Sequence, residues 1–197
     1  MSQTIQSFFT EAIERDFSRD FLFRVSNVNF GRGGPVLTDN QLVYAKGAIL
    51  PERTIGDIPV KYRGLEFHVP GSVTYGSAAG FSLDFYCDAD IRLREILLEE
   101  SRRVFDDQST TGDYNIAGKD ASITLLQLDK KLQTVMEYKL IGCSIRSVGS
   151  ITYDIAGGNG NVTSFTATMA YHYFTEQRLG IQESNLADGP PPPRAIQ

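Results

Sequence analysis

The segment 164–173 constrains the fold most, because its side chains alternate strictly between two kinds. Its odd-numbered residues are all apolar or aromatic, whereas the even-numbered ones are small, mostly hydroxylated and uncharged. Alternation over this length predicts a β-strand that buries one face. The other face lacks the lysine, glutamate or arginine that a solvent-facing strand ordinarily carries. It consists of Ser164, Thr166, Thr168, Ala170 and His172.

Alternation with a period of two recurs in other segments and makes strands the dominant element. The clearest are residues 21–30, 58–69 and 81–88, and the stretch 123–154 predicts two or three more strands. One segment between them has helical spacing instead. We therefore expect a mainly β (α+β) fold, an antiparallel β-sandwich or barrel with one packed α-helix.

The helix is predicted at about residues 89–106. An apolar stripe that includes Leu93 and Leu97 indicates its buried side. Asp88 and Asp90 lie at its start, where carboxylates cap a helix and favour its positive end. The opposite, polar side is predicted to carry Glu95, Glu99, Glu100 and Arg102.

A change of parity divides residues 58–69 into two parts. Apolar side chains occupy even positions up to Tyr62 and odd positions from Leu65 onward. The switch at Arg63-Gly64 predicts a two-residue hairpin turn, or else a bulge. Prolines at positions 51, 59 and 70 mark strand ends or edges.

Three parts of the chain differ in composition. Residues 1–20 are polar with spaced apolar side chains and predict an N-terminal arm or short helix. Residues 21–176 hold the alternating segments and the long helix, and predict the β-sandwich. Residues 177–197 contain four consecutive prolines and predict a tail outside the core.

Charge and composition disfavour several function classes. The net charge of −5 argues against a protein that grips nucleic acid by its phosphates. The chain has only two histidines, His68 and His172, without metal-ligand spacing, and its two cysteines, Cys87 and Cys143, lie in apolar segments and predict buried thiols. We therefore expect no cofactor, no metal and no catalytic residue. We also expect no membrane anchor, because no apolar run approaches the length of a membrane span.

Five segments in a fixed order resemble a known family. They are RDFSRDFLFRV, LPERTIGDIPVKYRGLEFHVPG, FSLDFY, RLREILLEESRRVF and FTATMAYHYF, and together they span roughly residues 10 to 176. In this order and spacing the chain resembles the tail-tube proteins of contractile-tailed bacteriophages. It is more distantly similar to the tube subunits of type VI secretion systems and R-type pyocins.

The resemblance implies a structural subunit that assembles with itself. Six copies would form a ring, and stacked rings a tube inside a sheath, with baseplate and tail-terminator proteins as further partners. DNA would pass through the tube without sequence-specific binding. The protein would be assembled in the host cytoplasm and reside in the virion tail.

The resemblance also suggests roles for three groups of residues. Ser164, Thr166 and Thr168 are candidates for the tube lumen, where a face without cations would not retain DNA phosphates. Solvent exposure or cover by a neighbouring subunit would explain this face equally well. Glu95, Glu99 and Arg102 are candidates for a sheath-facing surface. Candidates for contact with an adjacent subunit or ring are Leu50, Pro51, Ile58, Pro59, Tyr62, Arg63 and Gly64.

Other functions stay open at this point. A tube-initiating or baseplate subunit, or a secretion-system or pyocin tube subunit, would share the same assembly logic. A monomeric β-sandwich that binds carbohydrate or peptide is a more remote alternative, because most aromatic residues occupy alternating strand positions and not loops. An enzyme is the weakest alternative, since no catalytic motif is present.

Overall fold

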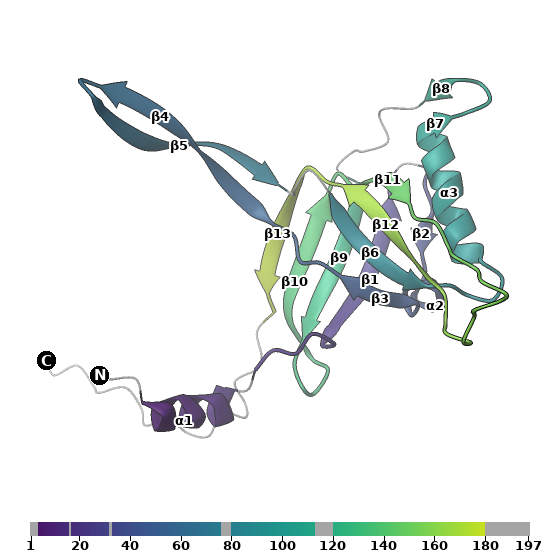
Figure 1. The fold of residues 1–197 in the computed structure, drawn as a ribbon, viewed down its shortest axis with the longest axis horizontal. Helices are drawn as coiled ribbons and strands as arrows, with labels where there is room; N and C mark the ends of the chain where they lie inside the picture. Colours follow the sequence, from purple (N-terminus) through teal and green to yellow (C-terminus); the bar gives the residue numbers. More distant parts are fainter. Residues whose placement is uncertain (1–3, 16, 32, 76–79, 113–119, 180–197) are drawn as a thin grey trace, which may run out of the picture.

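The computed structural model describes the chain except for residues 1–3, 16, 32, 76–79, 113–119 and 180–197. Two antiparallel sheets pack face to face, with one long helix along one side (Figure 1). Neither sheet closes on itself, so the fold is an open sandwich and not a barrel. The predicted fold class, mainly β with one packed helix, is confirmed.

The five-stranded sheet has the order β13-β10-β9-β1-β2. Asp129 follows β9, and its carboxylate accepts hydrogen bonds of 2.8 Å from the backbone N–H groups of Lys131 and Gln133, which closes the turn into β10. The strands are β1 (Phe23–Phe30), β2 (Val36–Leu37), β9 (Ala121–Leu128), β10 (Thr134–Ile141) and β13 (Tyr173–Arg178).

The four-stranded sheet has the order β11-β12-β6-β3. Its central pair places Phe165 opposite Phe85 and Ala167 opposite Leu83, all buried. The strands are β3 (Ala45–Ala48), β6 (Phe81–Tyr86), β11 (Ser144–Val148) and β12 (Ser164–Ala170).

The core fills the space between the two sheets. Val28, Ile123 and Leu140 form one row across β1, β9 and β10, and none of them is exposed to solvent. Phe85 and Phe165 stack from the other sheet, with ring centroids 5.6 Å apart. Inward-pointing residues therefore alternate along the central strands as predicted, except where a bulge interrupts β1.

The segment 164–173 is not one strand, which corrects the expectation from its alternation. β12 ends at Ala170, and after Tyr171 and His172 the chain enters β13 in the other sheet. Tyr171 still packs against the core. Apolar parity is kept across the corner because both sheets bury their inner faces against the same core. The sandwich also extends to Arg178, beyond the predicted boundary at residue 176.

Helix α3 (Arg92–Val104) is shorter than the predicted 89–106. Ile91 has a left-handed backbone (φ 55°) and Phe105 an extended one, so neither can belong to the helix. The Asp88 carboxylate accepts a 3.1 Å hydrogen bond from the Arg92 N–H, in agreement with its predicted capping role. Leu93 and Leu97 are buried under the helix, as predicted.

Four short elements lie outside the two sheets. Helix α1 (Ile5–Arg15) precedes the sandwich, in the predicted N-terminal arm. Helix α2 (Asp39–Leu42) begins with a capping box in which the Thr38 N–H donates to the Gln41 side chain. The two-residue strands β7 (Phe105–Asp106) and β8 (Thr111–Gly112) pair with each other after α3.

Strands β4 (Arg53–Tyr62) and β5 (Leu65–Tyr75) form a two-stranded ribbon that projects away from the sandwich (Figure 1). Arg63 and Gly64 connect them with positive φ angles of 48° and 84°, as in a type I′ turn. The predicted two-residue hairpin is therefore confirmed, and the alternative of a bulge at this position is wrong. Pro59 and Pro70 lie inside the strands and not at their ends.

Candidate assembly surfaces

The hydroxyl-rich side of β12 forms part of the outer face of the four-stranded sheet. Thr166 lies opposite Asp84, and Thr168 opposite Ser82. The Thr166 hydroxyl donates a 2.5 Å hydrogen bond to the Asp84 carboxylate. Thr166 is exposed, whereas Ser164 and Thr168 are half-buried. The three predicted residues therefore share one face of one strand.

Neighbouring strands bring charges to this face, which corrects the idea of a surface without them. Asp84 comes from β6. Lys46 comes from β3, and its Nζ lies 5.5 Å from the centre of the Tyr86 ring. Tyr86 in turn pairs with Ser164. The hydroxyl strip is thus flanked by a carboxylate and an ammonium group, which the sequence of β12 alone does not reveal.

One side of the β4–β5 ribbon is apolar and exposed. The register pairs Ile58 with Val69, Val60 with Phe67 and Tyr62 with Leu65, so six apolar side chains share a side. We call these six residues the ribbon face. Each keeps between 46% and 63% of its surface exposed. In an isolated chain this patch would face water, which is unusual for a monomeric protein.

The other side of the ribbon is polar, and prolines at its edges hinder pairing with a further strand. Lys61 and His68 both lie near Glu66, at 3.5 Å and 3.7 Å. The residue pair next to a two-residue turn is hydrogen-bonded, and hydrogen-bonded and non-hydrogen-bonded pairs alternate from there. Pro59 and Pro70 fall in non-hydrogen-bonded pairs, so their backbone nitrogens point outward at the ribbon edges. A proline there removes an edge donor and hinders the addition of another strand. The ribbon therefore exposes apolar side chains on one side and has prolines on its edges.

The base of the ribbon is attached to the sandwich by aromatic side chains. Tyr75 contacts Phe174 edge to face, with ring centroids 5.7 Å apart. The Tyr171 hydroxyl donates a 3.2 Å hydrogen bond to the Glu52 carbonyl, and burial raises the pKa of Tyr171 above its ordinary value. Leu50, which is 52% exposed, and Pro51 lie just before β4. The predicted contact residues are thus divided between the base and the tip of the ribbon.

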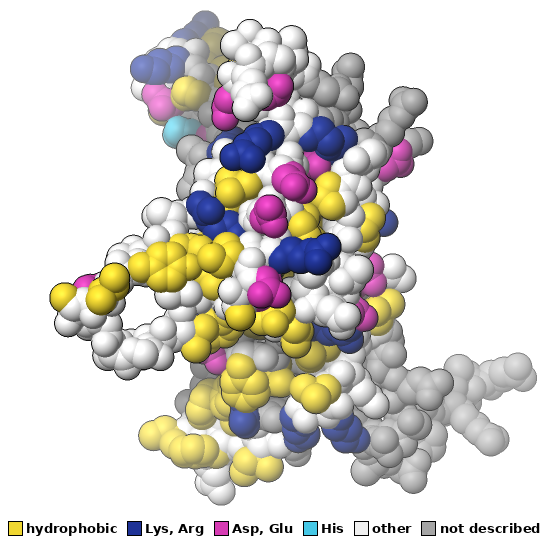
Figure 2. All heavy atoms as spheres, turned by 90° about the vertical axis from the view of Figure 1, so that its right-hand side faces the viewer, with side chains coloured by type: hydrophobic (Ala, Val, Ile, Leu, Met, Phe, Trp, Pro, Cys, Tyr) yellow, Lys and Arg dark blue, Asp and Glu magenta, His cyan; other side chains and the backbone are white. Residues whose placement is uncertain are grey.

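The exposed side of α3 carries charges of both signs. Glu95, Glu99 and Arg102 are exposed, at the positions predicted for the polar side. Figure 2 looks onto this side of the molecule and shows acidic and basic side chains intermixed over its middle. Next to it, Ser109 donates a hydrogen bond that lowers the pKa of Asp106. A surface of this kind favours a protein partner with complementary charges over a polyanion.

Comparisons with known proteins identify structures with a similar fold. No protein family model and no curated protein sequence matches the chain. Solved structures with a similar fold include one from the baseplate of the anti-feeding prophage (14% identity, 84% of this chain and 97% of that chain, TM-score 0.54). Another comes from the tube-terminating cap of the same particle (13% identity, 84% and 93%, TM-score 0.56). A third comes from the sheath/tube terminator of the PVC extracellular contractile injection system (14% identity, 81% and 95%, TM-score 0.56).

The chain has the fold of contractile-injection-system proteins. The match covers most of this chain and nearly all of each similar one. The resemblance to tail-tube-like proteins, inferred from five sequence segments, is confirmed at the level of the fold. The injection-system fold thus accounts for the sandwich and its packed helix.

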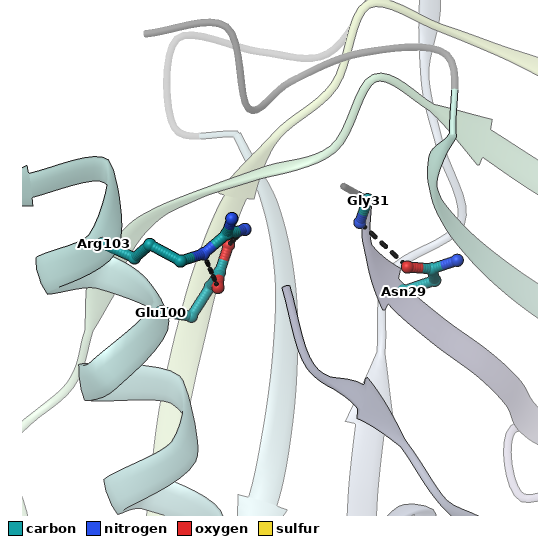
Figure 3. A network of polar contacts seen from close by, with 4 residues as sticks. All are labelled: Asn29, Gly31, Glu100 and Arg103. Atoms are coloured by element: carbon teal, nitrogen blue, oxygen red, sulfur yellow. Dashed lines mark hydrogen bonds and ion pairs between the residues drawn. The ribbon is translucent and has the colours of Figure 1, made fainter. Parts of the chain in front are cut away.

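Within this injection-system fold, Glu100 is a buried carboxylate that the sequence interpretation placed on the wrong side of α3. Its side chain is 1% exposed, and both oxygens accept hydrogen bonds from Arg103, at 2.8 Å and 2.6 Å. Figure 3 shows the pair beside the turn after β1, where the Gly31 N–H donates to the Asn29 side chain at 2.8 Å. A Cβ added at Gly34 would come within 2.6 Å of Arg103. Glu100 follows Leu93 by seven residues and Leu97 by three, and this helical spacing already places it on the buried side of α3.

Binding chemistry is sparse in the described part of the fold. No three His, Cys, Asp or Glu side chains come together there as a metal site. Burial raises the pKa of the Cys143 thiol to about 12, so it stays protonated and unreactive. No helix among the described residues is both long enough and apolar enough to cross a membrane.

Proposed function

We propose that this chain is a non-enzymatic structural subunit that assembles into hexameric rings, which stack into the tube of a phage tail or a related contractile system. The exposed ribbon face is the observation that carries the proposal. Six apolar side chains at about half exposure would gain on the order of several kcal/mol from burial against a partner. A second copy of the chain supplies such a partner at every step of a stack.

The four-stranded sheet is the proposed wall of the tube. Its edge strands β11 and β3 have no further strand beside them within the described chain. Pairing between neighbouring copies would satisfy these edges and close a ring. Ser164, Thr166 and Thr168 would then line the lumen, with Asp84 repeated around it. DNA phosphates would meet hydroxyls and carboxylates there, with Lys46 toward the edge of the face.

The charged side of α3 is the proposed contact with a surrounding sheath. Glu95, Glu99 and Arg102 are exposed and point away from the core. Baseplate and terminator proteins would bind the two ends of the tube. In this proposal the subunit is assembled in the host cytoplasm and resides in the virion tail or the injection particle.

Electron microscopy and sedimentation of the purified protein test the proposal directly. We expect six-membered rings or tubes with a central channel. The substitution Phe67→Ser should strongly reduce their number, because it removes a large aromatic side chain from the middle of the ribbon face. Its far-UV circular dichroism should match that of the wild-type protein, since Phe67 is 52% exposed and contributes little to the core.

Lys61→Ser is the matched control on the polar side of the same ribbon. It should assemble like the wild-type protein, because the Lys61–Glu66 pair is exposed and surface pairs contribute about 0–1 kcal/mol. A wild-type protein that stays monomeric at high concentration would contradict the proposed function. Normal assembly of Phe67→Ser would show that the ribbon face is not the contact.

Thr168→Lys tests the lumen assignment. The side chain points away from the core, so the variant should fold and assemble. In a ring, however, each added ammonium group is repeated around the channel and again in every stacked ring. We expect slower or incomplete DNA ejection at low salt, with recovery at higher salt because phosphate contacts weaken as salt rises.

Thr168→Gln is the control for size without charge and should eject DNA normally. Ejection kinetics from particles carrying each variant provide the measurement. If both variants assemble and eject DNA alike at every salt concentration, this face does not line the channel. Failure of Thr168→Gln to assemble would place the residue in a subunit contact instead.

A ring at the end of the tube is the second candidate. Three similar structures with TM-scores above 0.5 come from assemblies described as a baseplate, a terminating cap and a sheath/tube terminator. A main tube subunit polymerises into long tubes, whereas an end ring stays single. The length distribution of the particles in the same micrographs distinguishes the two.

A further inference from the structure

Helix α1 carries a second apolar surface, separate from the ribbon face. Ile5, Phe8, Phe9 and Ile13 follow helical spacing on one side of it and are between 58% and 80% exposed. We call these four residues the α1 stripe. The Phe8 ring contacts the ring of Phe9, with centroids 6.0 Å apart. The stripe is therefore a contiguous aromatic and aliphatic surface.

The length of α1 makes this exposure significant. The helix has only 11 residues, and isolated helices shorter than about 12–15 residues are marginal in water. Helices in proteins gain most of their stability from packing an apolar side. In the described chain the stripe residues stay exposed, so the helix gains little stability from packing on the sandwich. A partner that covers the stripe would stabilise it.

The α1 stripe and the ribbon face match each other in size. An aromatic side chain can bury about 150–250 Å². At the exposures found here, each patch offers on the order of 600 Å², close to the roughly 800 Å² that each partner contributes to a stable interface. The two elements leave the sandwich at separate places, the ribbon at one end and α1 at another (Figure 1).

We propose that the α1 stripe of one copy packs against the ribbon face of the next copy. This inference rests on the proposed function, in which copies of the chain assemble with one another. Two different patches on one chain make a heterologous contact, and such contacts propagate into rings or open stacks. The contact is between faces, because Pro59 and Pro70 hinder strand addition along the ribbon edges.

Cysteine cross-linking between two variants tests the pairing. The variants Phe8→Cys and Val60→Cys are purified separately, mixed under assembly conditions and treated with a short bis-maleimide. We expect cross-linked dimers in the mixture and none in either variant alone, because the contact joins two different surfaces. Thr10→Cys mixed with Lys61→Cys provides the control, since both positions lie on the opposite sides of their elements. Wild-type protein reports any cross-linking through Cys87 or Cys143.

Each outcome has a defined meaning when micrographs of the same samples are recorded. Cross-linking confined to the Phe8→Cys and Val60→Cys mixture supports the inference. Dimers in a single variant would overturn it in favour of a contact between identical surfaces. Rings or tubes without any cross-link would overturn the pairing while leaving the proposed function intact. Absence of rings and tubes from the wild-type protein would overturn both.

Discussion

Leu97→Asp is expected to abolish stable folding of the sandwich. Leu97 has no exposed surface and lies on the side of α3 that packs against the core. The substitution removes the packing of a leucine, which alone costs about 2–5 kcal/mol. It also buries a carboxylate without a partner, at a further cost of several kcal/mol. The sum is comparable to the whole stability of an ordinary domain, about 5–15 kcal/mol.

Glu99→Ala is the control two residues further along the same helix. Glu99 is exposed, so its removal should change the free energy of unfolding by no more than about 0.5 kcal/mol. Urea unfolding followed by circular dichroism measures both variants. Equal unfolding midpoints for Leu97→Asp and Glu99→Ala would show that the buried side of α3 is assigned wrongly.

Glu100→Ala is the second substitution with a large expected effect. The substitution Glu99→Ala at the neighbouring position is expected to change stability very little. The carboxylate of Glu100 is almost fully buried and accepts two hydrogen bonds from Arg103. Removing one partner of a buried ion pair costs about 3–5 kcal/mol. Arg103 keeps 29% of its side chain exposed, so water screens part of this cost. We expect a loss of about 2–3 kcal/mol, which corresponds to a fall in Tm of roughly 5–10 °C.

Glu100→Gln separates the charge from the shape. It keeps the size and one acceptor, so its Tm should lie between those of Glu100→Ala and the wild-type protein. Differential scanning calorimetry of the two variants beside Glu99→Ala gives the order. If Glu100→Ala and Glu99→Ala melt at the same temperature, the buried ion pair does not stabilise the fold.

Local patterns in the sequence determined most of the elements. Alternation located the core strands, because a strand that buries one face needs apolar side chains at every second position. The parity switch at Arg63-Gly64 located the hairpin turn, since a two-residue loop pairs Tyr62 with Leu65 and so moves the apolar side chains from even to odd positions. The stripe through Leu93 and Leu97 located α3. These features depend on neighbours within a few residues, which the sequence displays directly.

The candidate surfaces were predictable only in part. The sequence singled out the Ser/Thr side of β12 and the ribbon residues, but it did not show that the ribbon face stays uncovered. It placed Glu100 with Glu99 by charge, although its spacing from Leu97 assigns it to the buried side. The i,i+3 spacing within α3 brings Arg103 close to it, whereas only the tertiary structure shows that this pair lies beside the turn after β1.

Tertiary structure alone decided which distant segments meet. Alternation reveals that a strand buries one face, yet it does not name the partner strand, so the crossing between sheets at Tyr171 and His172 was not visible. Asp84 and Thr166 are 82 residues apart in the chain and become hydrogen-bonded only through the pairing of β6 with β12. The pattern along a strand is set by its own backbone. Which charged side chain lies next to a strand depends on which other strand pairs with it in the sheet.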